Sequence, residues 1–270
     1  MTARRVVLAL ILVAALASAL FAHDMFLKLE SYFLEPDAAV TVPLLNGTFS
    51  KSENSIARPR IADIAVLGPA GRATFDTTVV SARNDSTFFA LRTGAAGTYV
   101  IGVSTRPNII AMAGAQFHEY LTEEGLGHVI AARQQAGTAS DSVREQYAKH
   151  VKAIVQVGDA RSGSFGTALG YPAELVPLDN PYEWKRGGTL RFRAAANGAP
   201  VPDLTVISGG RTASGARLPR RELRTAPDGI ITLRPTGTGV WYLTYIHIGQ
   251  VTAPSHNYES EWATITFQLR

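Results

Sequence analysis

Between residues 25 and 105 the hydrophobic positions recur in short alternating or apolar runs that are separated by turn residues. Alternation with a period of two is typical of strands, because successive side chains point to opposite faces of a sheet. The separating turns include Asn46-Gly47 and Asn84-Asp85. The pattern predicts strands at Met25–Leu29, Ala39–Leu45, Ile61–Leu67, Phe75–Val80, Thr87–Leu91 and Gly97–Ser104. Short strands at this spacing favour an antiparallel sandwich over alternating strands and helices.

The period changes in the middle of the chain. Phe117, Tyr120 and Leu121 follow helical spacing up to Gly125, which suits the left-handed residue that ends many helices. The segment Ser142–Val157 also places its apolar residues on one helical face and begins with a capping-box spacing. We therefore expect helices here, with their apolar faces packed on a sheet.

A second β-like region follows a Gly/Ser-rich stretch. Its predicted strands are Leu175–Leu178, Thr189–Ala194, Leu204–Ser208, Ile230–Leu233, Gly239–Ile248 and Trp262–Leu269. The fold class is accordingly mainly β, with two antiparallel β-sandwich units and a helical insertion between them. The expected divisions are a signal peptide at 1–22, an N-terminal sandwich at 23–111, the helical insertion at 112–157, a linker at 158–171 and a C-terminal sandwich at 172–270.

The first residues predict export. Arg4 and Arg5 precede the apolar stretch Val6–Phe21, which is shorter than the ~20 residues that span a bilayer and resembles a secretory signal peptide more than a retained anchor. Cleavage after Ala19 has the better small-residue pattern, whereas cleavage after Ala22 makes His23 the first residue; the pattern favours neither decisively. No other apolar run approaches spanning length, so we expect a periplasmic or secreted chain without a membrane span.

The composition excludes several kinds of functional site. The 270 residues contain no cysteine, which excludes disulfides, thiolate metal ligands and thiol nucleophiles. Removing residues 1–22 leaves 24 basic residues (26 − 2) against 22 acidic ones. The densest basic run, Arg217 to Arg224, reads as a solvated loop, so a nucleic-acid partner is not expected. The chain has no P-loop, nucleophile elbow or His-Glu-x-x-His motif, so we expect a protein that is not an enzyme.

His23 is the sharpest candidate for chemistry. If cleavage leaves it N-terminal, its α-amine and ring Nδ1 are able to chelate one metal ion, and nitrogen ligands favour late divalent transition metals. His247, late in an apolar strand, is the best candidate for a third nitrogen, although a buried histidine bonded to the backbone is the more ordinary reading. Asp24 and Glu259 would add oxygen ligands, although a surface carboxylate is the more ordinary interpretation of each. His256 is a weaker substitute for His247.

Several stretches along the chain carry a family resemblance. They are Ala22-His23-Asp24, Asn46-Gly47-Thr48, Arg106-Pro107, Phe117 to Leu126, Tyr147-Ala148-Lys149, Glu174 to Pro177, Asn180-Pro181-Tyr182 and Tyr258 to Thr264. On these residues the chain resembles a family of exported bacterial proteins with a domain of unknown function, often labelled NikM-like or the periplasmic component of cobalt/nickel uptake. The resemblance implies a β-rich periplasmic protein whose second unit is similar to a prealbumin or carboxypeptidase-regulatory sandwich. It also implies cleavage after Ala22 and His23 as a metal ligand.

The leading hypothesis is a periplasmic protein that binds a divalent transition metal (Ni, Co or Cu) as its cofactor or cargo and delivers it to a metal importer or permease. An alternative is a non-metal module that binds a polysaccharide or a partner protein through exposed aromatic residues such as Tyr182, Trp184 and Tyr258. A third is a copper-dependent oxidase that uses the N-terminal histidine.

Overall fold

The computed structural model describes residues 24–270, so the predicted signal peptide and His23 lie outside the described residues. The first half contains β1 (Asp24–Leu27), β2 (Phe33–Leu34), β3 (Ala39–Thr48), β4 (Lys51–Ser52), β5 (Ile61–Gly68), β6 (Gly71–Thr74), β7 (Val80–Arg83), β8 (Ser86–Arg92), β9 (Gly97–Thr105), β10 (Asn108–Met112), α2 (Gly114–Glu123) and α3 (Gly127–Gln135). The second half contains β11 (Val143–Val157), β12 (Ala173–Pro177), β13 (Leu190–Ala196), β14 (Ala199–Pro200), β15 (Thr205–Thr212), β16 (Arg217–Arg224), β17 (Ile230–Leu233), β18 (Gly239–Gln250) and β19 (Tyr258–Leu269).

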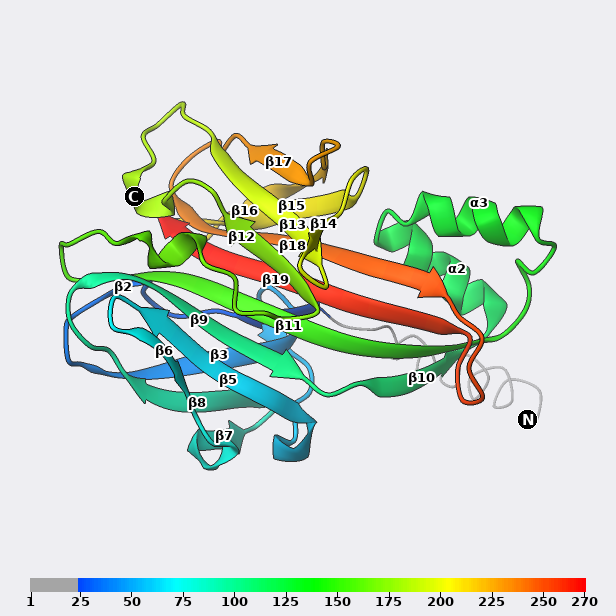
Figure 1. Ribbon diagram of the computed structural model, residues 1–270, viewed down its shortest axis with the longest axis horizontal. Coiled ribbons are helices and arrows are strands. Elements are labelled where there is room, and N and C mark those ends of the chain that lie inside the picture. The colour runs from blue at the N-terminus through cyan, green and yellow to red at the C-terminus, as the bar shows by residue number, and fades with distance from the viewer. Residues whose placement is uncertain (1–23) are drawn as a thin grey trace, which may run out of the picture.

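A large sheet runs through the middle of the molecule (Figure 1). Within residues 24–270 the strands form three sheets, and this central sheet has ten strands in the order β16-β15-β18-β19-β11-β9-β5-β6, with β10 and β2 also paired to β11. Its strands come from both halves of the chain, because β11 pairs antiparallel with β9 on one side and parallel with β19 on the other. The two predicted sandwich units therefore share one sheet.

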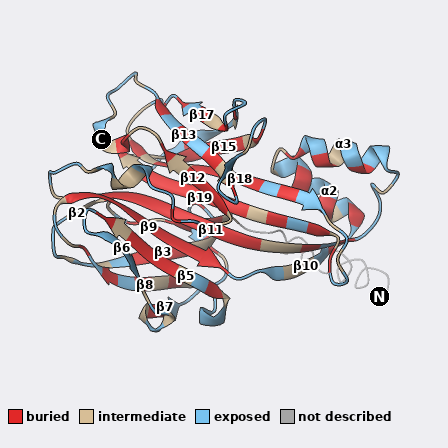
Figure 2. Cartoon of the chain, viewed as in Figure 1, coloured by how far each residue is buried: buried red, intermediate tan, exposed pale blue. Residues whose placement is uncertain are grey.

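A smaller sheet covers each face of the central sheet. The N-terminal sheet (β1, β3, β4, β7 and β8) packs on one face through an apolar core that includes Leu27, Val42 and Ile101. The C-terminal sheet (β12, β13, β14 and β17) packs on the opposite face around Phe192, Leu243 and Phe267. Buried residues consequently run along both faces of the central strands (Figure 2).

The two helices lie at one end of the central sheet, beside the ends of β18 and β19 (Figure 1). Phe117, Tyr120 and Leu121 of α2 are buried against Ile246 and Trp262. Gly125 follows α2 with φ +69°, the left-handed conformation that its position predicts. The helix ends there because a residue with a Cβ adopts this conformation only at a cost.

The predicted helix over Ser142–Val157 is wrong, because this segment forms the strand β11. The helical insertion thus ends at Gln135 in α3 rather than at residue 157. From Ala148 to Val157 every residue is buried, so the strand has no polar face that would reveal its alternation. Its polar members find partners inside the molecule instead: Lys152 Nζ lies 2.7 Å from Glu174 Oε2, and Thr98 Oγ1 donates to Gln156 Oε1 at 2.9 Å.

The mainly β, antiparallel sandwich class is confirmed. One further correction concerns Arg217 to Arg224, which forms strand β16 rather than a loop. Among the described helices, none combines the length and the apolar character required to cross a membrane.

Candidate functional site

Strand β1 brings the residue after His23 into the interior. Asp24 pairs with Gly47 of β3, and the next side chains alternate, with Met25 and Leu27 in the core below the N-terminal sheet. The Asp24 Oδ1 atom is buried and has no hydrogen-bond partner among the described residues. Burial raises the pKa of Asp24 to about 6, against the opposing effects of Lys149 and Arg220. An orphaned carboxylate oxygen is costly, so the position calls for a ligand or a proton.

The residue at the end of α2 adds a second carboxylate. The pKa of Glu124 is raised to about 8. Burial is the largest cause, and the nearby charge of Asp24 adds to it, whereas Arg220 opposes the shift. Arg220 Nη2 lies 4.0 Å from Glu124 Oε2. Asp24 and Glu124 are therefore neighbouring acids whose ionised forms disfavour one another.

Lys149 of β11 supplies the buried cation of this region. Its Nζ atom lies 3.3 Å from Asn46 Oδ1 and 5.0 Å from the centre of the Trp262 ring. Burial lowers the pKa of Lys149 to about 8, and the carboxyl groups of Asp24 and Glu145 oppose this shift. Lys149 therefore interacts electrostatically with several acids of this region.

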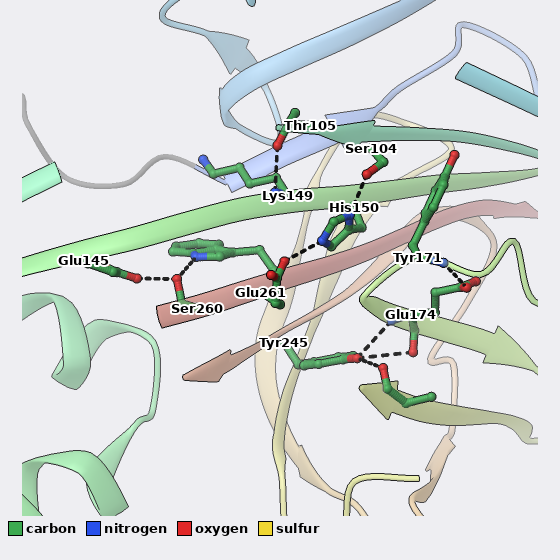
Figure 3. Close-up of polar contacts among 12 residues, drawn as sticks. Ser104, Thr105, Glu145, Lys149, His150, Tyr171, Glu174, Tyr245, Ser260 and Glu261 are labelled. Carbon is green, nitrogen blue, oxygen red and sulfur yellow. Dashed lines mark hydrogen bonds and ion pairs between the residues drawn. The ribbon is translucent and has the colours of Figure 1, made fainter. Parts of the chain in front are cut away.

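Glu145 is the deepest carboxyl group of the region. Its Oε1 atom accepts a hydrogen bond from Ser260 Oγ (Figure 3). The same oxygen accepts from the Tyr120 hydroxyl at 3.3 Å, and Trp262 Nε1 donates to Ser260 Oγ at 3.1 Å. The Oε2 atom has no partner among the described residues. Burial raises the pKa of Glu145 to about 7, although these hydrogen bonds lower it.

A pocket of about 590 Å³ opens beside Asp24. We call it the N-terminal pocket; its lining residues are Asp24, Phe26, Gly47, Thr48, Phe49, Ser50, Glu123, Glu124, Gly210, Arg211, Arg217, Leu218, Arg220 and Tyr242. The pocket joins segments far apart in the chain, namely β1, the β3–β4 turn, the end of α2 and the β15–β16 hairpin. One of its lining residues, Asp24, directly follows His23 in the sequence.

The other predicted ligands lie on the opposite face of the central sheet. Along β18 the side chains of Trp241, Leu243 and Tyr245 face the C-terminal sheet, and His247 continues this alternation as an exposed residue. Glu259 also lies on this face, where its Oε1 atom is 2.8 Å from His256 Nε2. The structure thus does not bring His247 or Glu259 together with Asp24.

A second histidine on that face has the partners of a hydrolytic triad but not its accessibility. His150 Nδ1 is 2.9 Å from Ser104 Oγ, and His150 Nε2 is 2.6 Å from Glu261 Oε2 (Figure 3). Ser104 and His150 are 7% and 2% exposed, so the hydroxyl is closed to a substrate. We assign these contacts to holding β9, β11 and β19 together.

The described residues alone hold no group of three or more His, Asp or Glu side chains placed to bind a metal ion. A set of three such ligands around Asp24 would therefore need a residue from outside residues 24–270, and His23 is the adjoining residue in the sequence. Glu124, Glu145 and Lys149 were not among the site residues predicted from the sequence. The available signal was their place in or beside stretches that carry the family resemblance, such as Phe117 to Leu126 and Tyr147-Ala148-Lys149.

Comparison with solved structures gives only distant likenesses. Trypsin-activated alpha-2-macroglobulin from Escherichia coli aligns with 91% of this chain at 10% identity and a TM-score of 0.24, and its native conformation aligns with 92% at 10% identity and 0.25. A tetra-tandem repeat from the extending region of a large adhesion protein aligns with 90% at 11% identity and 0.21. This chain spans 16%, 14% and 48% of those chains, respectively.

No curated protein matches the sequence. A family model, in contrast, matches residues 20–249, which is most of the chain and includes every residue of the N-terminal pocket. The chain belongs to the family described as "Domain of unknown function (DUF4198)".

Proposed function

We propose that this is an exported, periplasmic protein that binds a divalent transition metal (Ni, Co or Cu) through its mature N-terminus and delivers it to a metal importer. In the proposal His23 supplies two nitrogen ligands, its α-amine and its imidazole, and Asp24 supplies a carboxylate oxygen.

The orphaned Oδ1 atom of Asp24 carries the proposal. A buried carboxylate oxygen without a donor is unusual in a folded protein, and a cation satisfies it without a further side chain. Strand pairing with Gly47 fixes the backbone of Asp24 at the N-terminal pocket, and His23 is the residue that precedes Asp24 in the sequence. Nitrogen ligands at that place would select Cu(II) or Ni(II) over harder ions.

His247 and Glu259 take no part in this proposed centre, because they lie on the far face of the central sheet. That separation makes His247 a matched control for His23: both are histidines, and only His23 is adjacent in the sequence to a residue of the pocket.

The test begins with the intact mass of the exported chain, which we expect to start at His23. Titration with Ni(II), Co(II) and Cu(II) should then give one tight site per chain. His23→Ala, and a chain with one extra alanine before His23, should each weaken binding at least about 100-fold because either change removes a chelating nitrogen. Asp24→Asn should weaken binding less, and His247→Ala should leave it unchanged. A mature terminus at Leu20, or equal affinity in His23→Ala, refutes the proposal.

The alternative of a polysaccharide- or protein-binding module predicts that three aromatic residues are exposed, and the structure does not show them exposed. Tyr258 is 3% exposed in the core under α2, and the Tyr182 hydroxyl donates to the Ile154 carbonyl oxygen. Trp184 is half-buried and its Nε1 atom donates to the Gly188 carbonyl oxygen at 3.0 Å. Tyr258 is thus closed to a ligand, and the polar atoms of Tyr182 and Trp184 are bonded within the fold, so these residues do not form the expected binding surface and we do not propose this function.

A further inference from the structure

The N-terminal pocket contains three arginines that the proposed metal site does not use. Arg211 lies on β15, and Arg217 and Arg220 lie on β16, the edge strand of the central sheet. Guanidinium groups remain charged at any physiological pH and repel a bare metal cation. Their presence in this pocket therefore requires another explanation.

A β-bulge directs these side chains to one side. Residues 217 and 220 are three apart and would face opposite sides of a regular strand. Ser208 of β15 pairs with Arg221 of β16, and Gly210 pairs with Leu218. Between these two pairs β15 advances by two residues and β16 by three, so β16 contains one extra residue. The extra residue reverses the alternation, so Arg217 and Arg220 share the pocket side. Leu218 and Leu223 confirm the reversal, because both pack against the core on the other face.

The three arginines differ in how far they are already engaged. Arg211 is held across the pocket, with Nε donating to Ser50 Oγ at 3.1 Å and Nη1 donating to the Gly215 carbonyl oxygen at 2.7 Å. Arg220 lies within 3.6 Å of Glu222 and 4.0 Å of Glu124. The exposed Arg217 side chain makes no hydrogen bond or ion pair within residues 24–270. Arg217 opposes Arg211 in the strand register, so the two stand side by side.

The remaining wall is aromatic. Phe26, Phe49 and Tyr242 contact one another with ring centroids 4.9–5.1 Å apart, and all three line the pocket. A volume of about 590 Å³ lies in the range of small-molecule sites. It far exceeds the space that a single ion occupies. Both the size and the guanidinium groups point to an organic anion.

We propose that the N-terminal pocket takes the metal as its complex with a small polycarboxylate, with free carboxylates of that ligand bound by Arg211 and Arg217. This inference rests on the proposed function, because the metal of the complex is the one assigned to His23 and Asp24. Arginine suits the role, since its planar group binds a carboxylate through two parallel hydrogen bonds. The guanidinium group of Arg217 has no competing partner within residues 24–270, and the guanidinium group of Arg211 is already held in a fixed orientation by its hydrogen bonds.

The experiment compares three probes on the exported mature chain at constant ionic strength: Ni(II) alone, citrate alone, and Ni(II) with equimolar citrate. Citrate chelates Ni(II), so it weakens apparent binding by any protein that recognises only the free ion. Here we expect the opposite, a gain of about tenfold in apparent affinity. In Arg217→Gln and Arg211→Gln the gain should disappear and citrate should become a competitor. Arg221→Gln, on the other face of the same strand, should retain the gain.

The outcomes separate this inference from the proposed function. If citrate weakens Ni(II) binding to the unaltered chain, the complex is not the ligand and the inference is overturned, while metal binding at His23 stands. If Ni(II) binds neither alone nor with citrate, the proposed function fails and the inference fails with it. Arg217 is exposed, so circular dichroism of Arg217→Gln should match that of the unaltered chain.

Discussion

Two carboxyl groups that each have a buried oxygen atom, those of Asp24 and Glu145, illustrate what a sequence conceals at the level of single residues. Both read as ordinary acids, yet each has one oxygen without a partner among the described residues and a raised pKa. Hydrophobic periodicity does not reveal them, because burial here is decided by long-range packing of β1, α2 and β11. His23 was identifiable from the chemistry of a new N-terminus, and the place of Asp24 beside a pocket was not.

Glu145 should make stability depend on pH. Its pKa rises from 4.5 unfolded to about 7 folded, so between these values the unfolded chain has released a proton that the folded chain retains. Stability attributable to this group is complete below pH 4.5 and is lost as the pH rises to 7. Glu145→Gln preserves the acceptor for Ser260 and removes the charge. Urea denaturation should find it about 3 kcal/mol more stable than the unaltered chain at pH 8.

At pH 4 the two proteins should unfold alike, because Glu145 is protonated in both states. The matched control is Glu30→Gln at an exposed position, which should shift neither curve. A difference between Glu145→Gln and the unaltered chain that is the same at pH 4 and pH 8 would contradict the assignment.

The buried pair of Lys152 and Glu174 gives a second prediction at this scale. Nζ and Oε2 are 2.7 Å apart, and the side chains are 2% and 4% exposed. Glu174 also accepts hydrogen bonds from the backbone amides of Leu169 and Tyr171. Burial opposes ionisation of Glu174, and Lys152 is the main influence that lowers the pKa of Glu174 against this burial. Lys152→Met should therefore cost about 3–5 kcal/mol in denaturant unfolding, since it leaves a buried charge uncompensated. The double variant with Glu174→Gln should recover part of this loss, and a single-variant cost below about 1 kcal/mol would refute the argument.

At the scale of elements, the sequence predicted those strands and helices that have one buried face and one exposed face. Strand β8 alternates buried and exposed residues, and α2 buries Phe117, Tyr120 and Leu121 on one side, so both were identified. Strand β11 was assigned to a helix because its apolar residues also fall at helical spacing. Only its partners β9 and β19 determine that it is extended, and these are distant in the sequence. The bulge in β16 was not predicted for the same reason, because it is defined by the pairing of β16 with β15.

The end of α2 offers a test of element geometry. Gly125 has φ +69°, and a Cβ there would lie 3.0 Å from Thr205 Cγ2. Gly125→Ala should destabilise the chain by about 1–2 kcal/mol through the left-handed backbone conformation and this contact. Gly127→Ala, two residues later in α3 with nothing near its added Cβ, should be neutral or stabilising. Thermal unfolding of the pair decides, and equal melting temperatures would contradict the account.

For the whole molecule, the shared central sheet opposes a division into independent halves. The C-terminal region 172–270 supplies β15, β16, β18 and β19 to that sheet, and β19 lies parallel to β11 over nine register pairs from Glu145↔Tyr258 to Ala153↔Thr266. A fragment of residues 172–270 would leave β19 as a long unpaired edge with its apolar face exposed. We expect this fragment to be unfolded or aggregated by circular dichroism and amide hydrogen exchange, although its length suits a domain.

A fragment of residues 143–270 restores β11 and is the matched control. It should regain sheet signal and slow exchange at β18 and β19, because β11 again covers the edge of β19 and Lys152 again meets Glu174. Its other edge still lacks β9, so its stability should remain below that of the full chain. Native-like exchange protection in the shorter fragment would show that the C-terminal sandwich is a domain by itself, with β11 as an accessory strand.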